Sequence, residues 1–315
     1  MKETSSEGQI DRNSYSIAVI IPAFNEEGAI GQTLRSIQKL LPSAQLVVCD
    51  NKSTDKTSSE ASSAGALVLH ENKRGKGNAV RKLLTSVNAD IYILVDGDNT
   101  YDLSYMQGAL KIFIQERMDL MTGNRRAHGS SFMRLGHAFG NRLFTFALRS
   151  FLDVQTSDVF SGFRIMSRRL IRSFPLVSTE FEIETELSIF ASRMKLSQRD
   201  FPTRVKERVG TQSKLDTFKD GFKILFFVLR SVHREYPMKI YLPFGILGLV
   251  IGIASWLSLY FEFLETGLVL RFPTLIVACF VVLTSLLLLI TGILLREMST
   301  IKYQARYLAY IRNGD

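Results

Sequence analysis

The chain has 315 residues, of which 46% are hydrophobic and 22% charged, and its formal net charge is +9. This length allows one large domain or two ordinary ones, and so apolar a composition beside so many charges predicts a soluble part joined to an apolar part. The two cysteines, Cys49 and Cys279, lie far apart, which argues against a disulfide framework and favours a reducing, cytosolic setting for the soluble part. A basic chain can bind nucleic acid, an anionic membrane or a phosphorylated substrate.

Residues 1–14 are polar and contain no apolar core of a signal peptide, so we interpret them as a tail and expect no signal peptide. Strands and helices then alternate. Apolar runs predict strands at 16–21, 45–49, 66–69, 91–95 and 120–123, and helical spacing predicts helices at 26–41, from Asp55, at 75–86 and at 103–115. This alternation is typical of βαβ units and a mostly parallel sheet.

The pattern continues beyond residue 123. We predict a long helix at 132–152, strands at 160–167 and 196–205, and a helix at 179–195. A basic amphipathic segment covers residues 218–233. We therefore expect a soluble domain at residues 15–215 and a juxtamembrane helix at 216–237.

Two long apolar segments, 238–261 and 272–295, predict a membrane hairpin, because about 20 apolar residues cross a hydrocarbon core of about 30 Å. Basic residues flank the pair on both sides, and the tail at 296–315 is also basic. The positive-inside rule therefore places both termini and the soluble domain in the cytoplasm. Since much of the positive charge lies beside membrane segments and no nucleic-acid motif is present, we expect no nucleic-acid partner. A buried helical pair in a soluble protein is the alternative.

The run from 91 to 95 ends in Asp96, Gly97 and Asp98. In an open α/β sheet, ligands collect at the carboxyl ends of such strands. Two carboxylates at this position suit Mg²⁺ or Mn²⁺, which takes one or two carboxylates and completes its shell with phosphate oxygens. The alternative is a polar turn without a ligand.

Polar residues also follow the other early strands. The segment PAFNEE (22–27) follows the first strand, and Asp50 follows the second, where it can accept a hydrogen bond from a base or ribose or merely form a turn. Residues 53–55 are interpreted as helix-capping residues. The segment RGKGNA (74–79) is neither a full dinucleotide fingerprint nor a Walker A loop, but a basic helix start can face phosphate.

These segments, together with VDGDNTYD, TGNR and SGFRIMS in this order, resemble the family 2 glycosyltransferases. Within that family the chain is similar to the dolichyl- and polyprenyl-phosphate hexosyltransferases that carry a two-helix anchor. The resemblance implies an α/β GT-A fold, a Rossmann-like mixed sheet that binds a nucleotide sugar, followed by a transmembrane helical hairpin.

By position, the resemblance implies a nucleotide-sugar site, with Asp98 as the principal ligand of a Mg²⁺ or Mn²⁺ cofactor and Asp96 in the ribose or metal shell. The other nucleotide-sugar residues are Pro22, Phe24, Glu26, Asp50 and Lys76. Asn51 and Thr100 depart from the usual family pattern, which leaves the donor sugar and the complete metal shell open.

The acceptor side is predicted from scattered cations, because arginine can hold a lipid phosphate in bidentate geometry. The four candidates are Arg125, Arg164, Arg208 and Lys214, of which Arg125 and Arg164 are also placed with Asp98 in the catalytic set. A solvated surface is the alternative for scattered arginines. The acidic residues of 182–186 are competing candidates for a base, although their helical spacing lets at most two of them face a site.

The predicted function is inverting, metal-dependent transfer of a hexosyl group from GDP-mannose or a UDP-hexose to a polyprenyl phosphate at the cytoplasmic membrane face. Alternatives are a different lipid or glycan acceptor, or a non-catalytic nucleotide-sugar scaffold. Processive polysaccharide synthases typically carry a QxxRW motif. Such a synthase is disfavoured here because the sole tryptophan, Trp256, lies within a membrane segment. A transporter is disfavoured because the interiors of the spans lack charges. The sequence does not decide whether the protein forms a homo-oligomer.

Overall fold

The computed structural model describes residues 15–125, 146–176, 182–206 and 217–313. The chain divides into two compact units. The first unit is Met1–Arg149, Asp153–Leu215 and Arg306–Asp315, and the second is Ser150–Leu152 and Asp216–Ala305. Each is considered by itself.

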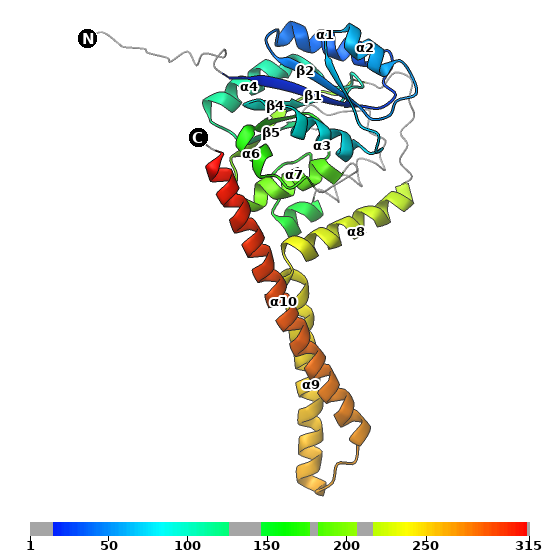
Figure 1. The fold of residues 1–315 in the computed structure, drawn as a ribbon. Helices are drawn as coiled ribbons and strands as arrows, with labels where there is room; N and C mark the ends of the chain where they lie inside the picture. The colour runs from blue at the N-terminus through cyan, green and yellow to red at the C-terminus, as the bar shows by residue number, and fades with distance from the viewer. Residues whose placement is uncertain (1–14, 126–145, 177–181, 207–216, 314–315) are drawn as a thin grey trace, which may run out of the picture. The chain divides into compact units, whose positions relative to one another are not determined.

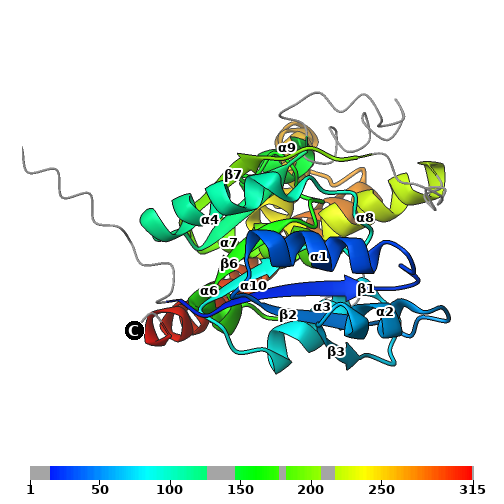
Figure 2. The same cartoon turned by 90° about the horizontal axis from the view of Figure 1, so that it is seen from above.

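The first unit is built on a seven-stranded sheet with the order β3-β2-β1-β4-β6-β5-β7 (Figures 1 and 2). The strands are β1 Ile17–Ala23, β2 Gln45–Asp50, β3 Leu67–His70, β4 Ile91–Leu94, β5 Leu120–Asn124, β6 Arg164–Ser167 and β7 Gln198–Pro202. Only β6 runs antiparallel to its neighbours, β4 and β5. The predicted α/β mixed sheet is confirmed. The carboxyl ends of the six like-directed strands therefore lie at the same edge of the sheet as the beginning of β6.

Helices cover both faces of this sheet. The helices are α1 Ile30–Leu40, α2 Thr57–Ser63, α3 Lys76–Ser86, α4 Met106–Gln115, α6 Arg168–Ser173 and α7 Glu182–Arg193, with a 3-10 turn at Leu103–Tyr105 before α4. Val19 and Ile21 of β1 belong to a core cluster that also holds apolar residues of α1, α2 and α4. Ile20, between them, is also fully buried but points to the opposite face, where α3 packs on β1. Burial on both faces explains the nearly continuous apolar sequence of β1.

Some predicted boundaries were wrong. The helix expected from Asp55 begins at Thr57, because the Asp55 carboxylate accepts hydrogen bonds from both the amide and the hydroxyl of Thr57. The strand expected at 160–167 begins at Arg164, because the preceding Gly162 amide donates to the hydroxyl of Tyr101 and does not join the ladder. The strand expected at 196–205 is limited to β7. Of the helix expected at 132–152, the described part, residues 146–152, is helical.

The second unit contains α8 Thr217–Glu235, α9 Met238–Thr266 and most of α10 Phe272–Arg312. Both α9 and α10 are long and apolar enough to cross a membrane, and most of their large apolar side chains are exposed. These helices are the two candidate spans. The helix α10 extends beyond the predicted span end, so that most of the segment interpreted as a basic tail is helical.

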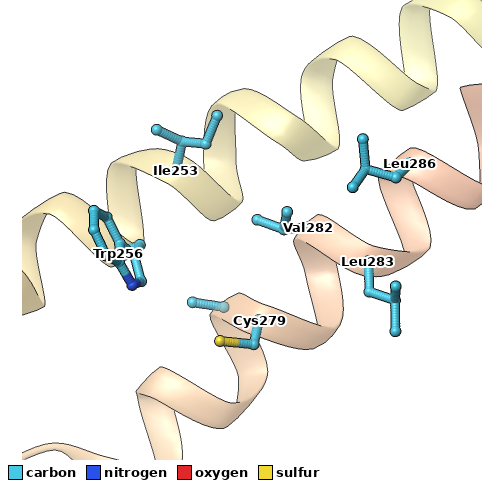
Figure 3. A pocket seen from close by; sticks show the side chains of 7 residues that line it. Ile253, Trp256, Cys279, Val282, Leu283 and Leu286 are labelled. Atoms are coloured by element: carbon cyan, nitrogen blue, oxygen red, sulfur yellow. The ribbon is translucent and has the colours of Figure 1, made fainter.

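Glycines let α9 and α10 pack closely. A Cβ added at Gly248 would lie 2.1 Å from Ser285 Oγ, and one at Gly252 would lie 2.6 Å from Val282 Cγ2. Small residues of this kind allow helix backbones to approach each other in a membrane. Between the same helices lies an apolar pocket of about 350 Å³, lined by Ile253, Trp256, Ala278, Cys279, Val282, Leu283 and Leu286 (Figure 3). No titratable side chain except the Cys279 thiol lines it, so the pocket offers little for group-transfer chemistry.

Candidate active site

The loops after β1 and β2 are held together by hydrogen bonds that pair one loop with the other. The Asn25 amide donates to Ser53 Oγ at 3.0 Å, and Asn25 Oδ1 accepts from the Thr54 amide at 2.9 Å. The Glu26 amide donates to Thr57 Oγ1 at 2.8 Å. Asn25 adopts a φ of 53°, a left-handed conformation that asparagine tolerates better than most residues. The polar sequence of these loops therefore builds a rigid rim beside Pro22 and Phe24.

Asp50 is the last residue of β2, Asn51 follows it, and both are buried. Asp50 Oδ1 accepts from the Ser53 amide at 2.9 Å, and Oδ2 accepts from the Ser58 hydroxyl. Burial by itself raises the pKa of Asp50, but these hydrogen bonds and the nearby His70 outweigh it and hold the pKa below its ordinary value. Asp50 is therefore an ionised acceptor at neutral pH.

Asn51 links the β2 loop to the segment that leads into α3. Its amide nitrogen donates to the carbonyl oxygens of Glu71 at 3.2 Å and Lys73 at 2.7 Å, and its Oδ1 accepts from the Gly75 amide at 2.7 Å. Gly75 has a φ of 127°, a conformation that L side chains rarely adopt. Asn51 thus holds the glycine turn that presents Lys76.

Lys76, the first residue of α3, bridges two carboxylates from different elements. Its ammonium lies 2.5 Å from Asp96 Oδ1 and 2.5 Å from Glu184 Oε1. Burial acts to lower the pKa of Lys76, but the two carboxylates outweigh it and raise the pKa above the ordinary value. Glu184 is 3% exposed and Asp96 is 26% exposed, so one end of this ion-pair cluster is buried and the other reaches the surface.

The Asp-Gly-Asp turn at the end of β4 is closely packed. A Cβ added at Gly162 would lie 2.2 Å from Asp96 Oδ2, so the backbone of residue 162 forms one wall of the carboxylate's position. Asp98 Oδ1 accepts from the amide and the hydroxyl of Thr100, at 3.1 and 2.6 Å. Both aspartates are partly exposed. Both carboxylates are therefore partly accessible at the edge of the sheet, while the Gly162 backbone limits the position of Asp96 and the Thr100 hydrogen bonds fix Asp98.

These residues fit a divalent cation that takes few protein ligands. No group of three or more potential ligands among His, Cys, Asp and Glu occurs within the described residues. Mg²⁺ is commonly held by one or two carboxylates with water and substrate phosphates, and Mn²⁺ favours the same oxygen ligands. The backbone of Gly162 lies close to Asp96 Oδ2, and the Lys76 ammonium donates a hydrogen bond to Asp96 Oδ1. Asp98 is partly exposed and accepts hydrogen bonds from Thr100, whereas Asp96 Oδ1 is paired with Lys76, so Asp98 is the better placed of the two to take a cation.

Arg125 follows β5 and forms a bidentate pair with Asp158, with Nε at 2.7 Å from Oδ2 and Nη2 at 2.8 Å from Oδ1. Asp158 is buried, whereas the Arg125 side chain is 24% exposed. Burial acts to lower the pKa of Arg125, but the carboxylate outweighs it, and the pKa is raised. Arg125 is therefore a permanently charged group at the site edge whose orientation is fixed by a carboxylate.

Arg164 is placed differently from what its sequence context predicted. Its side chain is fully buried, and its guanidinium donates to the carbonyl oxygens of Ser161 and Val159 and to Ser188 Oγ, at 2.9–3.0 Å. A phosphate cannot contact a guanidinium that is enclosed and bonded in this way. The prediction that Arg164 binds the acceptor phosphate is corrected accordingly: it is a structural residue at the start of β6. Arg208 and Lys214 lie outside the described residues.

Residues 18–174 match the domain of glycosyl transferase family 2. The chain belongs to this family. Protein RfbJ of Shigella flexneri is 41% identical over 126 residues, which are 40% of this chain and 98% of RfbJ. A dolichyl-phosphate hexose transferase of Haloferax volcanii is 27% identical over 208 residues, covering 66% of this chain and 90% of that enzyme. The chain is thus a glycosyltransferase.

The fold is similar to that of glucosyl-3-phosphoglycerate synthase from Mycobacterium tuberculosis. The structure of that enzyme with Mn²⁺, UDP and glucosyl-3-phosphoglycerate superposes with a TM-score of 0.57 at 22% identity, covering 70% of this chain and 80% of that one. This likeness supports the GT-A fold of the family 2 domain.

Four residues that form hydrogen bonds or ion pairs in this candidate site were not among the predicted site residues. They are Asn51, Tyr101, Asp158 and Glu184. Asn51 was noted only as a departure from the family pattern, and Glu184 only as one of several candidate bases. The acidic run at 182–186 was a signal, but only the fold shows which carboxylate faces the lysine.

Proposed function

We propose that this glycosyltransferase transfers a hexosyl group from a nucleotide sugar to a polyprenyl phosphate, with inversion and with a divalent cation. The observation that carries the proposal is the Asp96–Lys76 pair beside the partly exposed Asp98 at the carboxyl edge of the sheet. Negative and positive groups side by side suit a metal–diphosphate substrate, which carries charges of both signs.

We assign the donor to this edge of the sheet. Asp50 accepts a hydrogen bond from the base or ribose, and the rim formed by Pro22, Phe24 and Glu26 encloses the nucleoside. Phe24 supports this role because the Arg74 guanidinium carbon lies 4.1 Å from its ring centroid, which fixes the ring beside a cation. Lys76 faces the diphosphate, and Asp96 lies at the ribose or metal shell.

Asp98, with Asp96, would hold Mg²⁺ or Mn²⁺. When bound, such a cation neutralises charge that develops on the leaving nucleoside diphosphate. The donor-bound structure of the M. tuberculosis synthase, which contains Mn²⁺ and UDP-glucose, supports a divalent cation for this fold.

The acceptor needs little help from a base. The second ionisation of a phosphate monoester lies near pH 6, so a polyprenyl phosphate is an anion at neutral pH. What this chain's residues contribute is orientation of that anion and exclusion of water. Arg125 supports an acceptor role because Asp158 holds its guanidinium in one orientation while part of it stays exposed. We assign Arg208 and Lys214 to the same phosphate by family resemblance.

A polyprenyl acceptor is supported by the candidate spans α9 and α10 and by the dolichyl-phosphate hexose transferase among the relatives. We place the soluble domain and both termini in the cytoplasm, because basic residues flank the apolar pair while its connection carries two acidic residues and one basic residue. A different lipid acceptor is the second outcome that the following assay separates.

The test uses the purified full chain in detergent with Mn²⁺ or Mg²⁺, a short polyprenyl phosphate and radiolabelled UDP- and GDP-sugars. We expect label to enter the organic phase with one donor, to fail to do so after addition of EDTA, and to fail with Asp98→Asn. Inversion is read from the anomeric coupling constant of the product. Transfer to other lipids but not to polyprenyl phosphate would contradict the acceptor assignment. Absence of transfer with every donor would favour a nucleotide-sugar-binding scaffold.

A further inference from the structure

We propose that Glu184 is a positioning residue that, through its ion pair with Lys76, raises the affinity of the Asp96 and Asp98 site for a divalent cation. The inference rests on the proposed function in one respect, since it takes Asp98 and Asp96 as the residues that hold the cation. It assigns to Glu184 a role distinct from that of a catalytic base.

The contacts place Glu184 behind Lys76 and not beside the open side of the site. Glu184 Oε1 lies 2.5 Å from the Lys76 ammonium, and its side chain is 3% exposed. The same ammonium lies 2.5 Å from Asp96 Oδ1. The lysine therefore links Glu184 to Asp96, and the burial of Glu184 keeps its carboxylate away from the exposed side of the site.

The charges of this cluster decide its effect on a cation. Asp96, Lys76 and Glu184 together carry a net charge of −1, so the Lys76 charge is balanced and Asp96 remains attractive to a divalent cation. If Glu184 were neutral, the cluster would carry no net charge, and the Lys76–Asp96 pair would lose its balancing carboxylate. An ammonium 2.5 Å from a ligand carboxylate, without a second carboxylate to balance its charge, repels an incoming cation more strongly and competes with it for the same oxygen.

The surrounding helix keeps Glu184 in this position. Ser188 Oγ donates to the Glu184 carbonyl oxygen at 3.0 Å and accepts from Arg164 Nη1 at 2.9 Å. The buried Arg164 thereby fixes the first turn of α7. This gives the arginine a function that agrees with its burial: it anchors the turn that carries Glu184.

The experiment measures Mn²⁺ binding to the full chain in detergent by electron paramagnetic resonance of the free ion, without substrate. We expect Glu184→Gln to raise the Mn²⁺ Kd about fivefold or more, a coupling of ordinary size between two sites. The matched control is Glu182→Gln, which removes the same charge from an exposed position in the same helical turn and is expected to leave the Kd unchanged. The double variant Glu184→Gln, Lys76→Gln restores a net charge of −1 and is expected to return the Kd toward the wild-type value.

This rescue separates positioning from structure, because damage to the fold would make the double variant bind no better than Glu184→Gln. That result would overturn the inference, as would a Glu184→Gln Kd within about twofold of wild type. Loss of kcat in Glu184→Gln with unchanged Mn²⁺ affinity would indicate a base instead. Asp98→Asn distinguishes the two proposals: if it abolishes Mn²⁺ binding and Glu184→Gln does not alter it, only the role of Glu184 fails. If wild type and Asp98→Asn bind Mn²⁺ alike, the metal site of the proposed function fails, and the role of Glu184 fails with it.

Discussion

A single methyl group at residue 162 tests whether Asp96 must stay where the backbone places it. In Gly162→Ala the new Cβ would lie 2.2 Å from Asp96 Oδ2 and 2.6 Å from its Cγ, whereas real Cβ contacts essentially never fall below 3.0 Å. The carboxylate must therefore move by about 0.8 Å or more, and its pair with Lys76 at 2.5 Å is strained or lost. A displacement of about 1 Å in a catalytic site can cost about 10²-fold in rate.

The assay is hexosyl transfer by the full chain, with thermal unfolding measured in parallel. We expect kcat/KM of Gly162→Ala to fall about 10²-fold. The melting temperature is expected to fall only as far as the weakened Lys76–Asp96 pair requires, because Gly162 is not among the glycines with positive φ and alanine is compatible with its backbone. The matched control is Gly108→Ala in α4, where a Cβ meets nothing within 4 Å and replaces a helical glycine. That control is expected to retain activity and to gain about 0.5–1 kcal/mol of stability. Wild-type kcat/KM in Gly162→Ala would refute the reasoning that a fixed Asp96 is required.

Four further predictions concern other parts of the molecule. Asp98→Asn is expected to lower metal-dependent transfer by about 10²-fold or more without changing the melting temperature, as measured by radiolabel transfer and thermal unfolding. Asn51→Ala removes a buried amide that makes three hydrogen bonds, and we expect the free energy of unfolding, measured by chemical denaturation, to fall by about 1–3 kcal/mol. Tyr310→Phe removes a 2.8 Å hydrogen bond to a buried carboxylate and is expected to lower the free energy of unfolding by about 1 kcal/mol in chemical denaturation. Tyr307 is 51% exposed, and Tyr307→Phe is expected to leave that free energy unchanged. Burial alone would raise the pKa of Glu235, but a tyrosine hydrogen bond and two cations outweigh it and lower the pKa below its ordinary 4.5. At pH 7 the wild type is therefore expected to melt at a higher temperature than Glu235→Gln. This difference in melting temperature is expected to shrink as the pH falls below about 4.5.

Much of the first unit was predictable because its strands are buried on both faces. The run at β4 reads as strand without tertiary information, since Ile91–Leu94 is buried throughout. Amphipathic spacing identified α1 in the same way. Errors concentrated at ends of elements, where a side chain decides the boundary: Asp55 delays α2 by taking the amide of Thr57. No periodicity encodes such a contact.

The positions of the strand-end aspartates were more predictable than those of the arginines, for a physical reason. Aspartates that end buried strands are brought to one edge by the sheet itself, so their sequence position nearly determines their place. An arginine carries no such information. Arg125 and Arg164 both follow glycine-containing motifs, yet one is partly exposed on Asp158 and the other is fully enclosed. Which of the two stays exposed depends on partners that are 33 and 24 residues distant in the chain.

The same reasoning explains what an asparagine contributes at residue 51. An acidic residue at this position would add negative charge beside Asp50. Asn51 instead uses both ends of its amide, donating to two carbonyl oxygens and accepting from the amide of Gly75. A carboxylate has no N–H to donate, so it would leave those carbonyl oxygens unpaired and repel them. The asparagine therefore couples the end of β2, which carries Asp50, to the turn that carries Lys76. Under the proposed function, one side chain then sets the positions of both the nucleoside end and the diphosphate end of the donor site.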